Sequence, residues 1–325
     1  TTTTAEGIVI VNFYGLVDGS EASLKSYLNN LSGVDQVGAD ARAAMLATRS
    51  IKTSSKRWAI ETAITMVDLT TLEGADTPGK VKALCTKAVR PDPTDSTVPS
   101  VGAVCVYNDM VSVARTHLDL IGGQHVPVAA VSTAFPSGRA SMPVKIQDTQ
   151  DAIDAGAAEI DMVIDRGAFL AGRYIDVFNE IVQIKQVCGD KAHLKVIFET
   201  GELVTYGNVR KASFLAMAAG ADFIKTSTGK VAPAATPPVV LVMLEAVRDF
   251  YEMTNTRIGV KPAGGIRTTK DAIKQLVLVN ETVGPDWLNP KLFRIGASAL
   301  LNDLLMQRMK LDEGYYSSPQ YVTMD

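Results

Sequence analysis

The chain has 325 residues, of which 46% are hydrophobic and 21% are charged, as is usual for a soluble globular protein. Its net charge of −3 gives no electrostatic reason to expect binding to nucleic acids or anionic membranes. No apolar run approaches the length of a membrane span, and the first residues lack the pattern of a signal peptide. We therefore expect a cytoplasmic protein with no nucleic-acid or membrane partner.

Cysteine and histidine spacing argues against disulfides and metal sites. Cys85, Cys105 and Cys188 are scattered without CxxC spacing, and the three histidines have neither HxH nor HxxxH spacing. We therefore expect no disulfide framework and no metal ion.

Three regions are predicted along the chain. Residues 1–57 carry no chemical motif but contain two helical patterns, at 22–31 and 39–51, so we expect an N-terminal helical extension. Residues 58–310 form the main domain, and residues 311–325 form a C-terminal tail.

In the main domain, short apolar and β-branched runs alternate with segments of helical period. The predicted strands are residues 63–69, 102–107, 126–132, 159–164, 194–198, 222–224, 258–261 and 292–295. Helical segments follow them at residues 78–88, 110–118, 146–154, 171–187, 209–219, 239–253, 269–278 and 298–309. Eight strand-then-helix units at this spacing favour an α/β fold of the (β/α)₈ barrel type, with an open doubly wound sheet as the alternative.

Two lysines lie at the ends of consecutive predicted strands. Lys225 follows Phe223 and Ile224 directly, and Lys261 ends the next strand. The carboxyl ends of barrel strands share one mouth, so the two ammonium groups would lower each other's affinity for protons. A neutral lysine is a nucleophile toward carbonyl groups. We favour a catalytic pair over the alternative, in which each lysine simply extends to the surface.

Two aspartates lie in predicted strands. Asp161 is within the apolar run 159–164, where a buried carboxylate needs a cation or several donors. A lysine in the same mouth would supply the cation, but the residues alone leave a catalytic role and a structural ion pair equally open. Asp68 raises the same question more weakly, because an aspartate before two threonines can simply cap a loop.

Three segments have the composition of phosphate-binding loops: Thr228-Gly229-Lys230, Gly264-Gly265-Ile-Arg267 and Gly296-Ala-Ser298. The last two follow the seventh and eighth predicted strands, where barrels often bind phosphate at a helix N-terminus. Cys105, at the end of the second strand, lines the mouth or packs as a structural cysteine, and the second reading is the safer one.

Residues 60–305 carry, in order, the motifs of a known family. The lysine motifs Asp222-Phe-Ile-Lys-Thr-Ser-Thr-Gly-Lys230 and Gly259-Val-Lys-Pro-Ala-Gly-Gly-Ile-Arg-Thr268 resemble those of the 2-deoxyribose-5-phosphate aldolases. The resemblance extends to Val67-Asp-Leu-Thr-Thr-Leu72, Ala103-Val-Cys-Val-Tyr107, Ile160-Asp-Met-Val163, Val196-Ile-Phe-Glu-Thr-Gly-Glu-Leu203 and Arg294-Ile-Gly-Ala-Ser298. The N-terminal extension is similar to that of the longer, eukaryotic-type members.

The resemblance implies a cofactor-free class I aldolase, a lyase that reversibly cleaves 2-deoxy-D-ribose 5-phosphate to D-glyceraldehyde 3-phosphate and acetaldehyde in deoxynucleoside breakdown. By motif position, Lys225 would form the Schiff base, Lys261 would keep Lys225 deprotonated, and Asp161 would relay protons through a water. The residues expected to bind the substrate are Asp68, Thr70, Cys105, Thr228, Gly229, Lys230, Gly264, Gly265, Arg267, Gly296 and Ser298.

Two features depart from the pattern of some members. Ala299 stands where they have a second serine, so one hydroxyl contact to phosphate would be missing. Some members also end in a tyrosine that aids proton transfer, and its counterpart here would be Tyr315, Tyr316 or Tyr321.

Three other functions stay open at this stage. A class I aldolase or transaldolase could act on another sugar phosphate, and a non-catalytic barrel could merely bind one. A metal-dependent aldolase is disfavoured by the histidine spacing. In the first two cases the partner is a small sugar phosphate, and a homo-oligomer is compatible with each.

Overall fold

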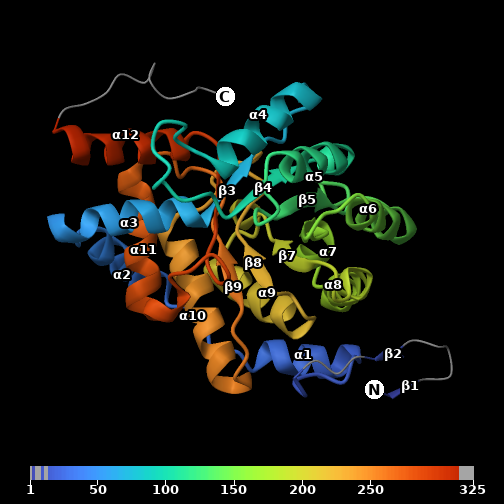
Figure 1. Cartoon of the computed structure of the whole chain (residues 1–325). Helices are drawn as coiled ribbons and strands as arrows, with labels where there is room; N and C mark the ends of the chain where they lie inside the picture. Colours follow the sequence, from blue (N-terminus) through green and yellow to red (C-terminus); the bar gives the residue numbers. More distant parts are fainter. Residues whose placement is uncertain (1, 4–8, 11–13, 315–325) are drawn as a thin grey trace.

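A parallel barrel of eight strands forms the centre of the computed structural model, which describes residues 2–3, 9–10 and 14–314 (Figure 1). The strands neighbour one another in chain order: β3 (Val67–Thr70), β4 (Ala103–Val106), β5 (Val128–Ser132), β6 (Glu159–Val163), β7 (His193–Ile197), β8 (Phe223–Lys225), β9 (Gly259–Lys261) and β10 (Ile295–Ala297). β10 pairs with β3, and parallel bridges from Val260 to Phe293 and from Ala263 to Gly296 join β9 to the β10 segment. The predicted (β/α)₈ barrel is therefore confirmed, and the open sheet is wrong.

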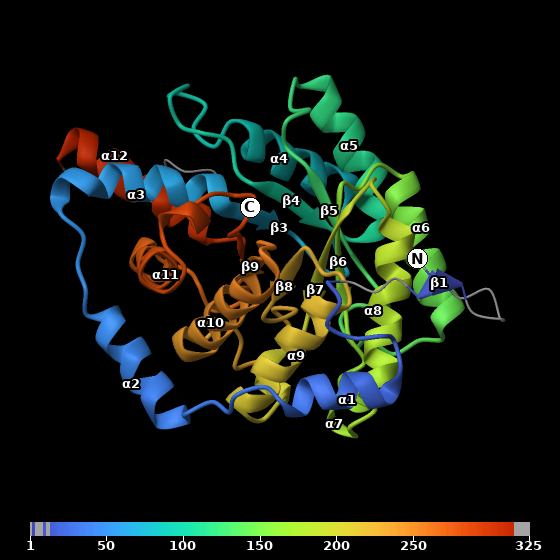
Figure 2. The same ribbon diagram turned by 90° about the horizontal axis from the view of Figure 1, so that it is seen from below.

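Helices cover the outside of the barrel, as parallel strands with two buried faces require (Figure 2). They are α4 (Pro78–Val89), α5 (Val111–Leu120), α6 (Met142–Asp154), α7 (Arg166–Leu170), α8 (Tyr174–Cys188), α9 (Tyr206–Ala218), α10 (Pro237–Thr254), α11 (Thr269–Thr282) and α12 (Leu300–Glu313). Single 3₁₀ turns lie at η1 (Asn108–Met110), η2 (Thr200–Glu202) and η3 (Pro285–Trp287). Among the helices of the described residues, none is long and apolar enough to cross a membrane.

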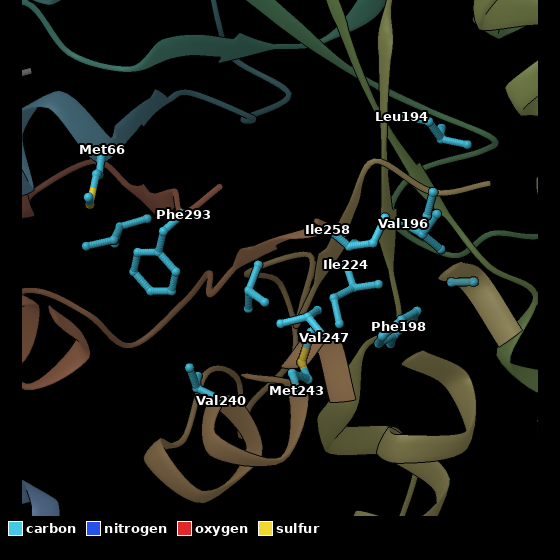
Figure 3. Close-up of a cluster of buried hydrophobic side chains, with 14 of the residues drawn as sticks. Met66, Leu194, Val196, Phe198, Ile224, Val240, Met243, Val247, Ile258 and Phe293 are labelled. Carbon is cyan, nitrogen blue, oxygen red and sulfur yellow. The ribbon is translucent and has the colours of Figure 1, made fainter. Parts of the chain in front are cut away.

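The main hydrophobic core lies between the strands and these helices. Ile224 of β8, for example, lies next to Met243 and Val247 of α10 (Figure 3), and all three are buried. Because successive side chains of a strand point to opposite faces, the neighbours of these apolar residues point into the barrel. Lys225 is one of these neighbours, so the pattern that builds the core also turns charged side chains inward.

The N-terminal extension wraps around the outside of the helical layer. It comprises the short antiparallel strands β1 (Thr2–Thr3) and β2 (Val9–Ile10) and the helices α1 (Glu21–Asn29), α2 (Gln36–Ala47) and α3 (Thr53–Met66). α1 contacts α8 and α9, α2 contacts α10 and α11, and α3 contacts α11 and α12. The last of these helices leads directly into β3 (Figure 1).

Some predicted boundaries differ from the structure. Residues 63–66 were expected in the first strand but form the end of α3, because their apolar side chains face neighbouring helices. Residues 292–294 precede β10 rather than belonging to it. The predicted helix 171–187 corresponds to α8, and the short helix α7 before it was not predicted. The expected domain boundaries after residues 57 and 310 lie inside α3 and α12. Tyr315, Tyr316 and Tyr321 lie outside the described residues.

Candidate active site

Lys225 and Lys261 meet at one carboxylate inside the barrel. They are paired residues in the parallel register of β8 and β9, so both side chains leave the sheet on the same face. Lys225 Nζ and Lys261 Nζ each lie 2.7 Å from Oδ2 of Asp161, which belongs to β6. All three side chains are almost completely buried, with Lys225 the most exposed at 3%. The structure thus brings together the three residues predicted to be catalytic.

A second layer of charged side chains surrounds this trio. Lys195 Nζ lies 2.9 Å from Asp161 Oδ1 and 2.5 Å from Glu159 Oε2. Arg294 donates to Asp68 Oδ1 at 2.6 Å and to Glu159 Oε1 at 2.8 Å. Asp68 Oδ2 lies 2.5 Å from Lys261 Nζ, which closes a loop of ion pairs back to the trio. Every buried charge in this cluster therefore has a partner, as stability requires.

The balance of charge in this cluster favours a neutral Lys225. Three carboxylates face four basic groups, so the cluster is balanced when one basic group is uncharged. Burial is the largest effect on Lys225 and lowers its pKa, against the attraction of Asp161 and with help from the charge of Lys261. Burial also opposes the charge of Lys261, but Asp161 and Asp68 outweigh it and raise the pKa of Lys261 well above its usual value.

The pKa values of the two aspartates in the cluster are lowered. Burial opposes the charge of Asp161, but Lys195, Lys225 and Lys261 outweigh it and hold its pKa well below the usual value. Asp68 behaves alike, because Lys261 and Arg294 overcome its burial and lower its pKa. The result is one lysine with a depressed pKa next to permanently charged neighbours, an arrangement that suits a nucleophilic amine.

A cavity of about 850 Å³ opens above Lys225. Its lining includes nine of the residues predicted to bind substrate: Thr70, Thr228, Gly229, Lys230, Gly264, Gly265, Arg267, Gly296 and Ser298. Asp68 and Cys105 are not in the lining, because Asp68 is held by its ion pairs and Cys105 is fully buried. Burial is the main reason why the pKa of the Cys105 thiol is raised.

The rim of the cavity is built from tight glycine turns. Gly229, Gly264 and Gly265 have φ values of 81°, 81° and 84°, which a residue with a Cβ rarely adopts. A Cβ on Gly264 would also meet the Cβ of Ala234 at 2.7 Å and the Cα of Gly229 at 3.4 Å. These turns place backbone N–H groups next to Lys230 and Arg267, which is the arrangement expected of an anion site. Ser298 and Ala299 lead into α12, whose first turn has no side-chain cap.

One wall of the barrel interior is apolar. Leu72, Cys105, Ala129 and Val131 form a small cluster separate from the main core, with Tyr107 and Phe135 packed against it. The rings of Tyr107 and Phe135 meet edge to face, with centroids 6.0 Å apart. The site therefore combines a charged floor, a cationic rim and an apolar wall.

Sequence reasoning missed four charged residues of the site. Glu159, Lys195 and Arg294 belong to the ion-pair cluster, and Glu73 forms a 2.8 Å ion pair with Lys230 across the cavity rim. A signal existed for Glu159 and Lys195, since both are charged residues within otherwise apolar strands. Arg294 carried the same signal, because it lies in the otherwise apolar predicted strand 292–295, whereas Glu73, in a loop, carried none. The described residues contain no group of three His, Cys, Asp or Glu side chains arranged to hold a metal ion.

Sequence comparison finds clear relatives. Residues 62–305 match the model of the DeoC/LacD family of aldolases. The chain is 44% identical over 278 residues to the deoxyribose-phosphate aldolase of Homo sapiens, which covers 82% of this chain and 87% of the human protein. It is also 44% identical over 280 residues to the deoxyribose-phosphate aldolase of Mus musculus, with 84% and 87% covered.

Solved structures agree with this relationship. QR15, an aldolase, superposes with a TM-score of 0.59 at 28% identity, covering 76% of this chain and 97% of that chain. The tetrameric deoxyribose phosphate aldolase of Aeropyrum pernix gives a TM-score of 0.61 at 22% identity, with 79% and 99% covered, and supports the fold alone. With most of its barrel matched by the family model and with relatives this similar, the chain belongs to the DeoC/LacD family of aldolases.

Proposed function

We propose that the protein is a class I aldolase that reversibly cleaves 2-deoxy-D-ribose 5-phosphate to D-glyceraldehyde 3-phosphate and acetaldehyde. The observation that carries this proposal is the contact of Lys225 Nζ and Lys261 Nζ with the same oxygen of Asp161, each at 2.7 Å. This trio lies beneath a cavity with a cationic glycine rim, as a phosphorylated carbonyl substrate requires. The 44% identity to the human deoxyribose-phosphate aldolase supports the choice of substrate.

Lys225 is the proposed nucleophile. Its neutral amine attacks the C1 aldehyde of the open-chain sugar, and loss of the carbonyl oxygen as water leaves a protonated imine. Asp161 is close enough to Nζ to take up and return protons during this addition and dehydration, directly or through a water. Lys261 stays charged next to both groups and so disfavours a second positive charge on free Lys225.

Bond cleavage follows from the imine. The C3 hydroxyl gives up its proton and becomes a carbonyl, while the electrons of the C2–C3 bond move toward the positively charged nitrogen. D-glyceraldehyde 3-phosphate leaves, and a two-carbon enamine remains on Lys225. Protonation at C2 and addition of water then release acetaldehyde and restore the free amine. The apolar cluster that contains Leu72 and Val131 would exclude bulk water from the enamine.

The glycine rim is the proposed phosphate site. The Lys230 ammonium and the Arg267 guanidinium supply positive charge, and the turns at Gly229, Gly264 and Gly265 supply N–H donors. Ser298 adds a hydroxyl at the start of α12, where the helix dipole also favours an anion. At Ala299 only the backbone N–H can contribute. Asp68 acts indirectly in this scheme, since it holds Lys261 rather than the substrate.

We further propose that the enzyme is a cytoplasmic homo-oligomer. The three cysteines are buried and unpaired, which is consistent with a reducing compartment. The structural neighbour from Aeropyrum pernix is described as a tetramer, and we extend assembly to this chain only as part of the proposal. Light scattering on the purified protein would give the number of subunits, and a monomer at micromolar concentration would contradict this part of the proposal.

Borohydride trapping tests the central proposal. The protein is incubated with 2-deoxyribose 5-phosphate and sodium borohydride, and the modified peptide is mapped by mass spectrometry. We expect the reduced adduct on Lys225, and acetaldehyde release by the untreated enzyme. An adduct on another lysine, or full activity in Lys225→Ala, would contradict the role of Lys225. Release of a different aldehyde from another sugar phosphate, with none from 2-deoxyribose 5-phosphate, would instead contradict the substrate.

A further inference from the structure

Glu199 is a buried carboxylate that the reaction scheme above leaves without a role. It lies directly after Phe198, just past the end of β7, and has no exposed surface. Its φ of 55° and ψ of 64° place it in the left-handed region, which is unfavourable for a residue with a long side chain. Burial raises the pKa of this carboxyl, against the effect of Thr228 and Arg166. A strained, buried acid next to an active site calls for a functional explanation.

Its carboxylate holds the first residue of the Thr228-Gly229-Lys230 turn. The Thr228 hydroxyl donates a short hydrogen bond to Glu199 Oε2, and the Thr228 N–H lies 3.4 Å from both carboxylate oxygens. The same hydroxyl oxygen accepts the Lys230 N–H at 3.1 Å. One carboxylate therefore orients both Thr228 donors, and through the hydroxyl it also orients the backbone at Lys230.

The turn is fixed on both sides. The Thr200 N–H donates to Thr226 O at 2.9 Å, which ties the segment after Glu199 to the segment before Thr228. A Cβ on Gly201 would meet Pro233 O at 2.2 Å, so η2 packs directly against the far end of the same loop. Within the described part of the chain, the Gly229 N–H has no hydrogen-bond acceptor. The turn thus presents a free donor to the cavity while its neighbours are held.

A carboxylate this close to the proposed phosphate site would repel the phosphate, so contact with the ligand is an unsuitable role for it. Its hydrogen bonds all run to Thr228, on the turn itself. We propose that Glu199 is a positioning residue that sets the preference for phosphorylated over unphosphorylated sugar by ordering the Thr228-Gly229-Lys230 turn. This inference rests on the proposed function, because it assigns the phosphate of that substrate to the ordered turn.

The test compares two substrates and three proteins. Glu199→Ala and a control, Glu202→Gln, are assayed with 2-deoxyribose 5-phosphate and with 2-deoxyribose. Glu202 lies in η2, which follows Glu199 directly, but its side chain is 41% exposed and pairs with Arg166. In Glu199→Ala we expect KM for the phosphorylated sugar to rise about tenfold or more, with kcat/KM for 2-deoxyribose changed less than about twofold. Inhibition by inorganic phosphate should weaken by a similar factor, and Glu202→Gln should match the wild type.

Other outcomes would overturn the proposal. An equal loss with both substrates would mean that Glu199 supports the fold or the chemistry, and an unchanged KM would mean that the turn orders itself. If Glu199→Ala does not fold, Glu199→Gln provides the test, since its amide has one acceptor oxygen in place of two and no negative charge, which weakens the hydrogen bonds from Thr228. A Glu199→Gln variant whose phosphate inhibition equals the wild type overturns the proposal in that case. Failure of the wild type to cleave 2-deoxyribose 5-phosphate would instead refute the proposed function.

Discussion

Lys225 and Lys261 share one oxygen of Asp161, yet their pKa values shift in opposite directions. The difference comes from Asp68, which lies 2.5 Å from Lys261 Nζ and adds a second carboxylate to that lysine alone. At Lys225 burial is the largest effect on the pKa, and Asp161 is the one carboxylate that opposes it. The barrel interior therefore makes two lysines of the same register chemically unequal through a residue on β3.

Replacing Lys261 with leucine should move the pH dependence of the reaction. The pKa of Lys225 is depressed from 10.5, so the wild-type rate should rise with pH and level off as Lys225 loses its proton. Without the Lys261 charge, less positive charge opposes protonation of Lys225, while Asp161 still pairs with Lys225 and Lys195, so the midpoint of kcat/KM should shift to higher pH. Turnover at neutral pH should fall about 100-fold. Lys270→Leu, at an exposed site on α11, serves as the control, and an unshifted midpoint in Lys261→Leu would contradict the electrostatic role.

Asp68→Asn should lower the free energy of unfolding and reduce the difference between the pKa values of Lys225 and Lys261. The substitution leaves Lys261 and Arg294 short of a carboxylate inside the barrel. Breaking a buried ion pair in this way lowers the free energy of unfolding by roughly 3–5 kcal/mol. Urea denaturation measures the loss, with Asp286→Asn as control because its pair with Arg257 is exposed and is worth less than about 1 kcal/mol. Equal stability losses in the two variants would contradict the importance of the buried cluster.

Stability should fall in acid. The pKa values of Asp161 and Asp68 are lower in the folded protein than in the unfolded chain, where an aspartate titrates near about 3.9. Their contribution is therefore complete above about pH 4 and is lost as the pH falls further toward the folded pKa values. Urea denaturation from pH 7 to pH 3 should show this decline. The free energy of unfolding of Asp68→Asn, which lacks one of the two aspartates, should decline less steeply with falling pH. Parallel declines in the variant and the wild type would show that protonation of Asp68 does not cause the loss.

Glu73→Gln should improve phosphate binding. In the structure Glu73 pairs with Lys230 at 2.8 Å, with 63% of the Glu73 side chain exposed, so a bound phosphate must compete with this carboxylate. An exposed pair is worth less than about 1 kcal/mol, so KM for 2-deoxyribose 5-phosphate should fall by at most about fivefold. The gain should shrink at high salt. Glu21→Gln, which removes the same charge on α1, should leave KM unchanged, and a raised KM in Glu73→Gln would show that Glu73 assists the site.

The barrel and the catalytic trio could be predicted from the sequence, but most of the charged residues that support the trio were not. Eight regular units favoured the barrel, although the order of the strands came only from the structure. Lys225, Lys261 and Asp161 stood out because charge is rare in apolar strands. Residues 63–66 were mistaken for strand because the buried face of α3 is as apolar as a strand. Arg294 and Glu73 meet their partners only in the folded chain, because Asp68 and Lys230 lie 226 and 157 residues away along the sequence.

The passage from α3 to β3 has a practical consequence for shortened versions of the enzyme. α3 spans Thr53–Met66, and Asp68, which holds Lys261, follows two residues after its end. Residues 60, 63 and 64 are fully buried in this helix, which contacts α11 and α12. A truncation at residue 57 would remove the first turn of α3. It would weaken the packing that holds β3, the strand whose Asp68 separates the pKa values of the two lysines. A shortened enzyme that retains the charge pattern of the active site must therefore keep the buried residues of α3 that precede β3.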